Sequence, residues 1–152
     1  MRFDLDEQFM DLALAEAKKA EAAGEVPVGA IVVADGAIVG RGFNQPISTN
    51  DPTAHAEILA LREAASTIGN YRLSTVTMYS TVEPCMMCAG AMIYARLARL
   101  VFGAPDLKAG SAGSIYNVLT DPRLNHRVEV LCLIRQAECA SLLRDFFARR
   151  RT

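Results

Sequence analysis

Hydrophobic residues recur at helical spacing near the start of the chain. Residues 6–23 consist mostly of Ala, Leu, Glu and Lys, which all have high helix propensity. One apolar stripe along this segment consists of Phe9, Ala13, Ala17 and Ala20. Such spacing is typical of a helix with one apolar face, and Gly24 is placed to end it. We therefore predict a helix over residues 6–23.

The pattern then changes to two β-prone runs, at residues 28–33 and 38–43. They are joined through Asp35-Gly36, a dipeptide that tolerates the positive φ angles of a tight hairpin turn. The two runs are therefore predicted to form a pair of antiparallel strands.

A second helix is predicted from about residue 54 to residue 68. Asp51-Pro52-Thr53 supplies N-cap candidates and a helix-starting proline, and Gly69-Asn70 supplies a stop signal. This assignment puts His55 in the first turn of the helix.

The second half of the chain alternates between strands and helices. Residues 75–82 predict a third strand, a helix begins at Pro84 and runs to about Tyr94, and residues 100–102 form a short fourth strand. A strand-helix-strand unit favours parallel pairing. Residues 128–134 add a fifth strand before a C-terminal helix over about 137–149. The expected fold is α/β in three layers, with a mixed five-stranded sheet and helices on both faces.

Composition agrees with one domain over residues 1–152. A chain of 152 residues, 51% of them hydrophobic, can build a sizeable core around one sheet. Its acidic start lacks the apolar run of a signal peptide, and no segment approaches the roughly 18 apolar residues of a membrane span. We expect a cytoplasmic protein that does not associate with a membrane.

The charge is small in total but uneven along the chain. The formal net charge is −1, so composition alone does not indicate a nucleic-acid-binding protein. Residues 1–70 carry five basic and eleven acidic side chains, whereas residues 71–152 carry eleven basic and six acidic ones. Solvated faces that fall unevenly would explain this asymmetry. If the protein does face phosphates, the second half should supply that surface.

The most informative combination is His55-Ala56-Glu57, followed 26 residues after the glutamate by Glu83-Pro84-Cys85-Met86-Met87-Cys88. Two cysteines three residues apart at a helix start lie on one face and can bind the same ion. A helix N-terminus also lowers thiol pKa values and so favours the thiolate. Thiolate and imidazole ligands suit zinc, and His55 is expected to come from the start of another helix.

Three protein ligands leave one tetrahedral position for water, which distinguishes a catalytic zinc site from a structural one. Bound zinc lowers the pKa of water from about 15.7 to about 7. Glu57, two residues after the histidine ligand, need not bind the metal and is predicted to move protons between this water and a substrate ring.

Other interpretations of the cysteines remain open. A closed zinc site would take its fourth ligand from His126, Cys132 or Cys139. Cys132 lies in an apolar predicted strand and Cys139 on a helix face, so plain core cysteines are the simpler interpretation of both. A disulfide between Cys85 and Cys88 is a further alternative.

The complete pattern is the signature described for zinc deaminases, and the chain resembles the cytidine deaminase superfamily. Within it, the chain resembles the bacterial tRNA-specific adenosine deaminases, which convert the anticodon wobble adenosine to inosine. The resemblance covers nearly the whole chain. Besides the zinc motif, it rests on residues 25–30, 42–44, 110–114 and 125–129.

This resemblance implies a cytidine deaminase-like fold, one Zn²⁺ per subunit held by His55, Cys85 and Cys88, and proton transfer by Glu57. It further implies a homodimer, a tRNA anticodon stem-loop as partner, and no organic cofactor. It also implies substrate-binding residues. Asn44 would contact the flipped nucleotide, and Asp106 and Lys108 would face the anticodon loop. Phe147 and Arg150, which belong to the Phe146-Phe147 and Arg149-Arg150-Arg151 segments, would flank the RNA.

Simpler roles are open for some of these residues. Asn44 is also typical of a turn residue that satisfies nearby backbone. Adjacent aromatics on a helix usually put one ring inside, so Phe146 and Phe147 are also candidates for the core. A terminal arginine run is often a solvated tail.

The function predicted for the chain is hydrolysis of the adenosine C–N bond at the wobble position of a tRNA anticodon loop. Bases in such a loop cost less to unstack than paired ones. One alternative is a deaminase of free bases or nucleotides, of the guanine or cytosine type. From another class, the alternatives are a nonenzymatic RNA-binding module with structural zinc, or one subunit of a heteromeric editor.

Overall fold

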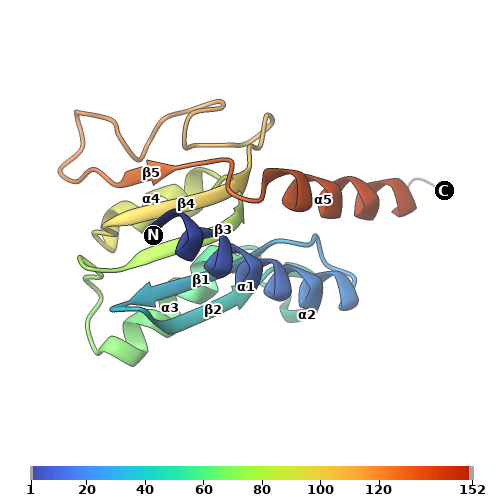
Figure 1. Cartoon of the computed structure of the whole chain (residues 1–152), viewed down its shortest axis with the longest axis horizontal. Coiled ribbons are helices and arrows are strands. Elements are labelled where there is room, and N and C mark those ends of the chain that lie inside the picture. The colour runs from blue at the N-terminus through green and yellow to red at the C-terminus, as the bar shows by residue number, and fades with distance from the viewer. Residues whose placement is uncertain (1, 151–152) are drawn as a thin grey trace.

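Five strands form one sheet in the order β2-β1-β3-β4-β5. The computed structural model describes residues 2–150 (Figure 1). The strands are β1 (Gly29–Ala34), β2 (Ala37–Phe43), β3 (Thr77–Val82), β4 (Arg99–Ala104) and β5 (Glu129–Leu131). β1 pairs antiparallel with β2 and β3, whereas β3, β4 and β5 are parallel. The expected mixed sheet is confirmed.

Helices cover both faces of this sheet and make three layers (Figure 1). They are α1 (Arg2–Ala22), α2 (Pro46–Thr49), α3 (Ala56–Ile68), α4 (Met86–Tyr94) and α5 (Gln136–Arg150). α1 and α5 contribute to the hydrophobic cluster on one face, and α3 and α4 contribute to the cluster on the other. The three-layer α/β prediction is therefore confirmed.

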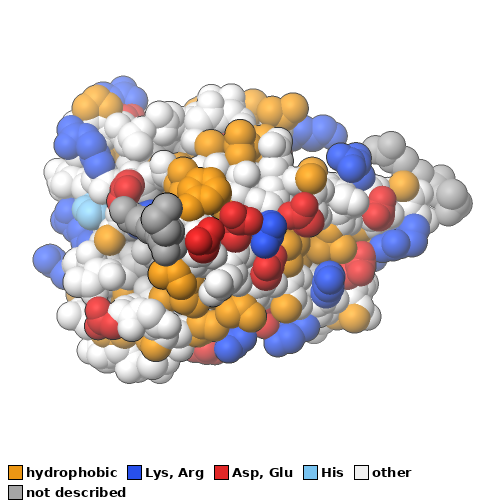
Figure 2. Space-filling model, in the orientation of Figure 1, with side chains coloured by type: hydrophobic (Ala, Val, Ile, Leu, Met, Phe, Trp, Pro, Cys, Tyr) orange, Lys and Arg blue, Asp and Glu red, His pale blue; other side chains and the backbone are white. Residues whose placement is uncertain are grey.

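Charged side chains are spread over the α1 side of the molecule. Figure 2 shows acidic, basic and hydrophobic side chains mixed on this face, with further Lys and Arg side chains beside α5 and at the opposite end. No single sign of charge dominates the view. Among residues 2–150, no helix is both long and apolar enough to cross a membrane.

The hairpin between β1 and β2 has the predicted turn. Asp35 and Gly36 have φ angles of 50° and 78°, the left-handed values that this kind of tight turn requires. Beyond β2 the chain forms α2, a short helix that the hydrophobic pattern does not predict.

Several element boundaries differ from those expected. α3 begins at Ala56 rather than near residue 54, because Asp51 accepts hydrogen bonds from the backbone and hydroxyl of Thr53 in a local turn instead of capping the helix. α4 likewise begins at Met86 rather than at Pro84. The fifth strand spans 129–131 instead of 128–134, so Cys132 lies beyond it.

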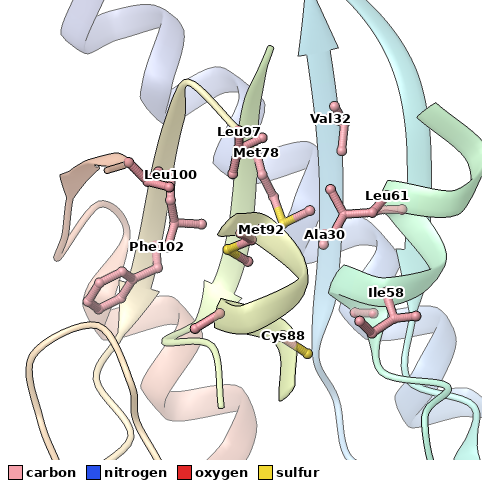
Figure 3. Packing of buried hydrophobic residues seen from close by; sticks show 14 of the residues in the cluster. Ala30, Val32, Ile58, Leu61, Met78, Cys88, Met92, Leu97, Leu100 and Phe102 are labelled. Carbon is pink, nitrogen blue, oxygen red and sulfur yellow. The ribbon is translucent and has the colours of Figure 1, made fainter. Parts of the chain in front are cut away.

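The larger hydrophobic cluster lies between the sheet and the α3–α4 layer. Figure 3 shows Met92 of α4 over the strand that carries Met78, and Leu61 of α3 beside Ala30 and Val32 of β1. Met92, Met78 and Leu100 are completely buried. This packing holds the two helices on the same face of the sheet, and the predicted metal ligands lie at their N-terminal ends.

Two glycines in β2 let α3 lie directly on the sheet. A Cβ at Gly40 would be 2.3 Å from the carbonyl oxygen of Ala60, and one at Gly42 would be 2.2 Å from that of Ala56. These distances are far shorter than any van der Waals contact, so the two backbones approach as closely as glycine permits. The glycines therefore fix the distance between β2 and the first turn of α3.

Candidate active site

The predicted metal ligands lie at the starts of two helices. His55 is the N-cap residue of α3 and Cys85 the N-cap residue of α4, both with extended backbone. Cys88 is the third residue of α4. His55 thus lies one position before the helix instead of in its first turn, and Cys85 also precedes its helix. The three residues thus lie at two helix starts, as expected, and their binding of a metal stays a prediction.

These three side chains meet in space. The Nδ1 atom of His55 is 3.5 Å from the Sγ atom of Cys85 and 3.5 Å from the Sγ atom of Cys88. The three ligand atoms all lie within 4.8 Å of one another. Tetrahedral zinc with Zn–N near 2.05 Å and Zn–S near 2.3 Å requires N···S distances of about 3.6 Å. The group can hold a metal ion, and its dimensions fit zinc.

The described residues do not add a fourth ligand. The metal-binding group found among residues 2–150 contains only His55, Cys85 and Cys88. His126 instead contacts the carbonyl oxygen of Leu97 through Nε2, at 2.7 Å. The geometry therefore favours the open, three-ligand interpretation over the closed one.

The cysteines outside the motif have different environments. Cys139 is buried, as expected of a core residue, whereas Cys132 is exposed, so the interpretation of Cys132 as a core cysteine is wrong. Its strand ends at Leu131, before the cysteine. Cys85 and Cys88 are both free thiols, and no disulfide joins them.

The environment of the metal-binding group favours a thiolate. A hydrogen bond from the Cys88 thiol, helped by His55, lowers the pKa of Cys85 to about 4. The same interaction with Cys85, together with burial, raises the pKa of Cys88. The hydrogen bond to Cys85 raises the pKa of His55. Cys85 is therefore prepared as a metal-binding thiolate, and the positive charge of a metal favours loss of the second thiol proton.

Glu57 lies next to this group without being part of it. It is the second residue of α3, and only 4% of its surface is exposed. Burial raises its pKa to about 7. A carboxyl group with this pKa both accepts and donates protons readily near neutral pH.

A cavity of about 540 Å³ contains the functional residues. Its wall includes His55, Glu57 and Cys85, together with the loop 105–109 and Phe147 of α5. Glu83 also lines the cavity, as do apolar side chains that the sequence reasoning did not single out, namely Val26, Val28, Val82 and Leu143. The volume is that of a typical small-molecule site, large enough for a single nucleobase.

Asn44 has a local structural role and also lines the cavity. Its Oδ1 atom accepts a hydrogen bond from the backbone N–H of Ala56, at 2.9 Å, and so caps α3 from outside the helix. The simpler interpretation, that this residue satisfies nearby backbone, is confirmed. Because the side chain also borders the cavity, its predicted contact with the nucleotide stays a prediction.

The residues assigned to the RNA lie in two settings. Asp106, Lys108 and Phe147 all line the cavity. Arg150 does not line the cavity. Its guanidinium lies 4.6 Å over the ring of Phe146 and donates a hydrogen bond to the carbonyl oxygen of Gly24.

The rest of the C-terminal segment is partly tied to α1. Arg149 forms an ion pair with Glu21 at 2.7 Å, and Arg151 lies outside the described residues. Phe146 is buried while Phe147 is 43% exposed. One ring of the pair is therefore inside, as the helical pattern suggests, and the other borders the cavity.

Glu83 is a site residue whose role was missed, since it was treated only as part of the motif. Its buried carboxylate accepts backbone hydrogen bonds from Asp106, Ala112 and Ser114. Burial alone would raise the pKa of Glu83, but the hydrogen bonds from Ser114 and from the backbone outweigh it and hold the pKa below its usual value. The Gly/Ser-rich stretch at 110–114 was the available signal, because such segments expose backbone N–H groups to anions.

Comparison with known proteins gives consistent matches. Residues 4–151 match the model of the MafB19-like deaminase family. The tRNA-specific adenosine deaminase of Haemophilus influenzae is 50% identical over 152 residues, which cover 99% of this chain and 88% of that protein. A structure solved in a study of A-to-I editing by tRNA:A34 deaminases at the wobble position of transfer RNA matches with a TM-score of 0.86. It shares 41% identity, and the match covers 90% of this chain and 99% of that one.

A more distant neighbour has a different substrate. The guanine deaminase of Nitrosomonas europaea matches with a TM-score of 0.82 and 25% identity, over 93% of this chain and 84% of that one. The fold is thus shared with a protein that acts on a different nucleobase.

Proposed function

The chain belongs to the MafB19-like deaminases and, among them, to the tRNA-specific adenosine deaminases, and on this basis we propose that it hydrolyses the wobble adenosine of a tRNA anticodon loop to inosine. The observation that carries the proposal is that the buried Glu57 lines one cavity together with His55 and Cys85 of the three-residue metal-binding group. We infer that this group holds one zinc ion through the Nδ1 atom of His55 and the two thiolates.

Each part of the reaction has a residue suited to it. When bound, zinc acts as a Lewis acid that makes water a nucleophile near neutral pH. Glu57 takes a proton from the attacking water and delivers it to N1 of adenine while the new C6–O bond forms. It then transfers the second water proton to the amino group, which leaves as ammonia when the C6–N bond breaks. The carboxyl group ends the cycle in its starting state.

The cavity wall orients the base for this attack. The Asn44 amide oxygen is used by the α3 backbone, so its NH₂ group is the part available to an acceptor on the nucleotide. Val26, Val28 and Val82 provide apolar walls, and such walls exclude water from the reacting ring. A base extruded from a single-stranded loop fits this arrangement.

The rim of the cavity has groups suited to RNA outside the reacting base. Phe147 offers an exposed ring on which a splayed base can stack. The Lys108 side chain is exposed and, within residues 2–150, makes no hydrogen bond or ion pair. Arg149 and Arg150 already have partners in the chain, so we assign the main phosphate contact to Lys108.

Activity on defined substrates tests this proposal. The purified protein is incubated with a tRNA anticodon stem-loop carrying adenosine at the wobble position, and in parallel with free adenosine, guanine and cytosine. Nucleoside and base mass spectrometry measures the products, and metal analysis counts zinc per chain. Inosine from the RNA with little product from free bases is expected. Guanine or cytosine deamination with unmodified RNA would instead favour the free-base enzyme.

We also propose that the protein acts as a homodimer through the face formed by α3 and α4. Tyr94, at the end of α4, is 83% exposed, and Tyr71 and Met86 are also exposed. A hollow of about 400 Å³ between the two helices is almost entirely apolar, and Tyr71 and Tyr94 both line it. Exposed apolar surface of this kind is typical of a protein interface. We further propose that residues 1–152 form a single domain. We also propose that the protein is cytoplasmic, because tRNA is found there.

A further inference from the structure

Glu83 joins the metal-binding segment to the loop that borders the cavity. It lies between Val82, the last residue of β3, and the Pro84-Cys85 start of the α4 region. Its Oε1 atom accepts a hydrogen bond from the backbone of Asp106 at 3.0 Å. Its Oε2 atom accepts from the backbones of Ala112, at 2.9 Å, and Ser114, at 3.0 Å. The Ser114 hydroxyl is a fourth donor.

The loop over residues 106–114, which we call the rim loop, is folded around this carboxylate. A Cβ at Gly110 would lie 2.4 Å from the carboxyl carbon of Glu83, so only glycine permits the approach. The buried Ser111 donates its backbone N–H to the carbonyl oxygen of Pro84, at 2.8 Å. Apart from an isolated β-bridge between Ala112 and Asn117, the rim loop has no helix or strand structure. Its shape therefore depends on contacts with the segment that carries Cys85.

The order extends from Glu83 to the cavity edge. Asp106, held by Glu83 through its N–H, accepts hydrogen bonds from the backbones of Lys108 and Ala109, at 3.0 and 3.1 Å. This turn sets the direction in which the exposed Lys108 leaves the backbone. Asp106, Lys108 and Ala109 line the cavity. Loss of the hydrogen bonds to Glu83 would therefore displace this part of the cavity wall.

We propose that Glu83 is a positioning residue that holds the rim loop in the shape needed to bind the RNA around the reacting nucleotide. Glu83 also borders the cavity, but its carboxylate accepts four hydrogen bonds from the rim loop, so we assign it no contact with the reacting atoms. The part of the proposal that concerns RNA rests on the proposed function, whereas the part that concerns loop order stands on the contacts alone. A carboxylate that accepts four hydrogen bonds is a strong anchor, because charge-assisted bonds are about twice as strong as neutral ones.

The first test is Glu83→Gln, which keeps the size of the side chain but replaces one acceptor oxygen with a donor. Hydrogen exchange without RNA should show the amides of Asp106, Ala112 and Ser114 exchanging at least about tenfold faster, since each loses a charged acceptor. KM for the anticodon stem-loop should rise about tenfold, with kcat within about threefold, because uniform binding is lost. Zinc content should stay at the wild-type level.

Matched variants separate positioning from general damage. Asp121 also orders a loop, by accepting the backbone N–H of Arg123 at 2.9 Å, but that loop does not line the cavity. Asp121→Asn should therefore leave KM and the rim-loop exchange unchanged. Ser114→Ala removes only one donor to Glu83 and should give a smaller change in the same direction. It also serves as the decisive variant if Glu83→Gln does not fold.

Two results would overturn the proposal. One is wild-type exchange of the rim-loop amides in both Glu83→Gln and Ser114→Ala, which would show that the carboxylate does not hold the loop. The other is a loosened loop with an unchanged KM, which would remove its role in RNA binding. A wild-type protein that deaminates only free bases would contradict the proposed function instead, and the exchange experiment would still decide whether Glu83 orders the loop.

Discussion

At the scale of single residues, the carboxyl group of Glu57 has the clearest expected effect. Glu57→Gln removes the proton carrier and keeps the shape, so kcat should fall by about 10² to 10⁴ while zinc content stays unchanged. Steady-state deamination of the stem-loop and metal analysis measure the two quantities. Glu63→Gln, on the exposed side of the same helix, is the control and should behave as wild type. Near-normal turnover in Glu57→Gln would exclude proton transfer by this residue.

Sequence reasoning was most successful for residues whose chemistry depends on local spacing. The sequence predicts that one site contains His55, Cys85 and Cys88, because two helix starts and a Cys-x-x-Cys spacing define most of its geometry. Glu83 could not be assigned in the same way, since its partners lie 23 to 31 residues further along the chain. Contacts of this kind depend on the folded loop rather than on the period of the sequence.

At the scale of elements, the contact between β2 and α3 controls where Glu57 lies. Gly42→Ala would place a methyl group against the Ala56 carbonyl, so α3 must shift at the turn that carries Glu57. We expect a loss of about 1 to 3 kcal/mol in unfolding free energy, with a lower kcat, measured by denaturant unfolding and stem-loop kinetics.

The matched control for this prediction lies on the same strand. Arg41 is exposed on β2 between the two glycines, so Arg41→Ala should change stability by less than about 0.5 kcal/mol. If Gly42→Ala were as stable and active as wild type, the spacing between β2 and α3 would not be the constraint that positions the site.

The long elements could be predicted because their signals are local and repeated. The stripe on α1 and the Asp35-Gly36 turn are examples, and both occur as expected. The start of α3 was misplaced because Asp51 bonds to Thr53 rather than to the helix, and its cap comes from Asn44, twelve residues before Ala56. α2 was missed because a helix of four residues is too short to show a period.

At the scale of the whole molecule, the basic second half of the chain should contribute to RNA affinity through a few exposed groups. Lys108→Ala should weaken stem-loop binding and reduce the slope of log affinity against log salt by about 0.7, the value for one contact to a single-stranded phosphate. Binding titrations over a range of salt concentrations measure this slope. Arg149→Ala, which removes a side chain already paired with Glu21, should change it less. An unchanged slope in Lys108→Ala would show that another residue makes the phosphate contact.

The proposed dimer can be tested on the same scale. Tyr94→Asp puts a charge on the exposed apolar face of α4, so the dimer dissociation constant should rise tenfold or more, equivalent to about 1.4 kcal/mol. Sedimentation velocity over a dilution series measures it. Leu5→Asp, on exposed α1 at the opposite face of the sheet, is the control. A monomeric wild-type protein, or equal dimerisation by Tyr94→Asp, would contradict the assignment of this face.

The meeting of two helix starts at one point also sets the charge balance of the site. Each start contributes about half a positive elementary charge from its aligned peptide dipoles, and α3 and α4 both begin there. Together they offset roughly one anion, such as the Cys85 thiolate, before any cation arrives. The backbone dipoles thus balance part of the negative charge of the cysteine thiolates. Removal of the metal should accordingly abolish turnover while leaving the protein folded.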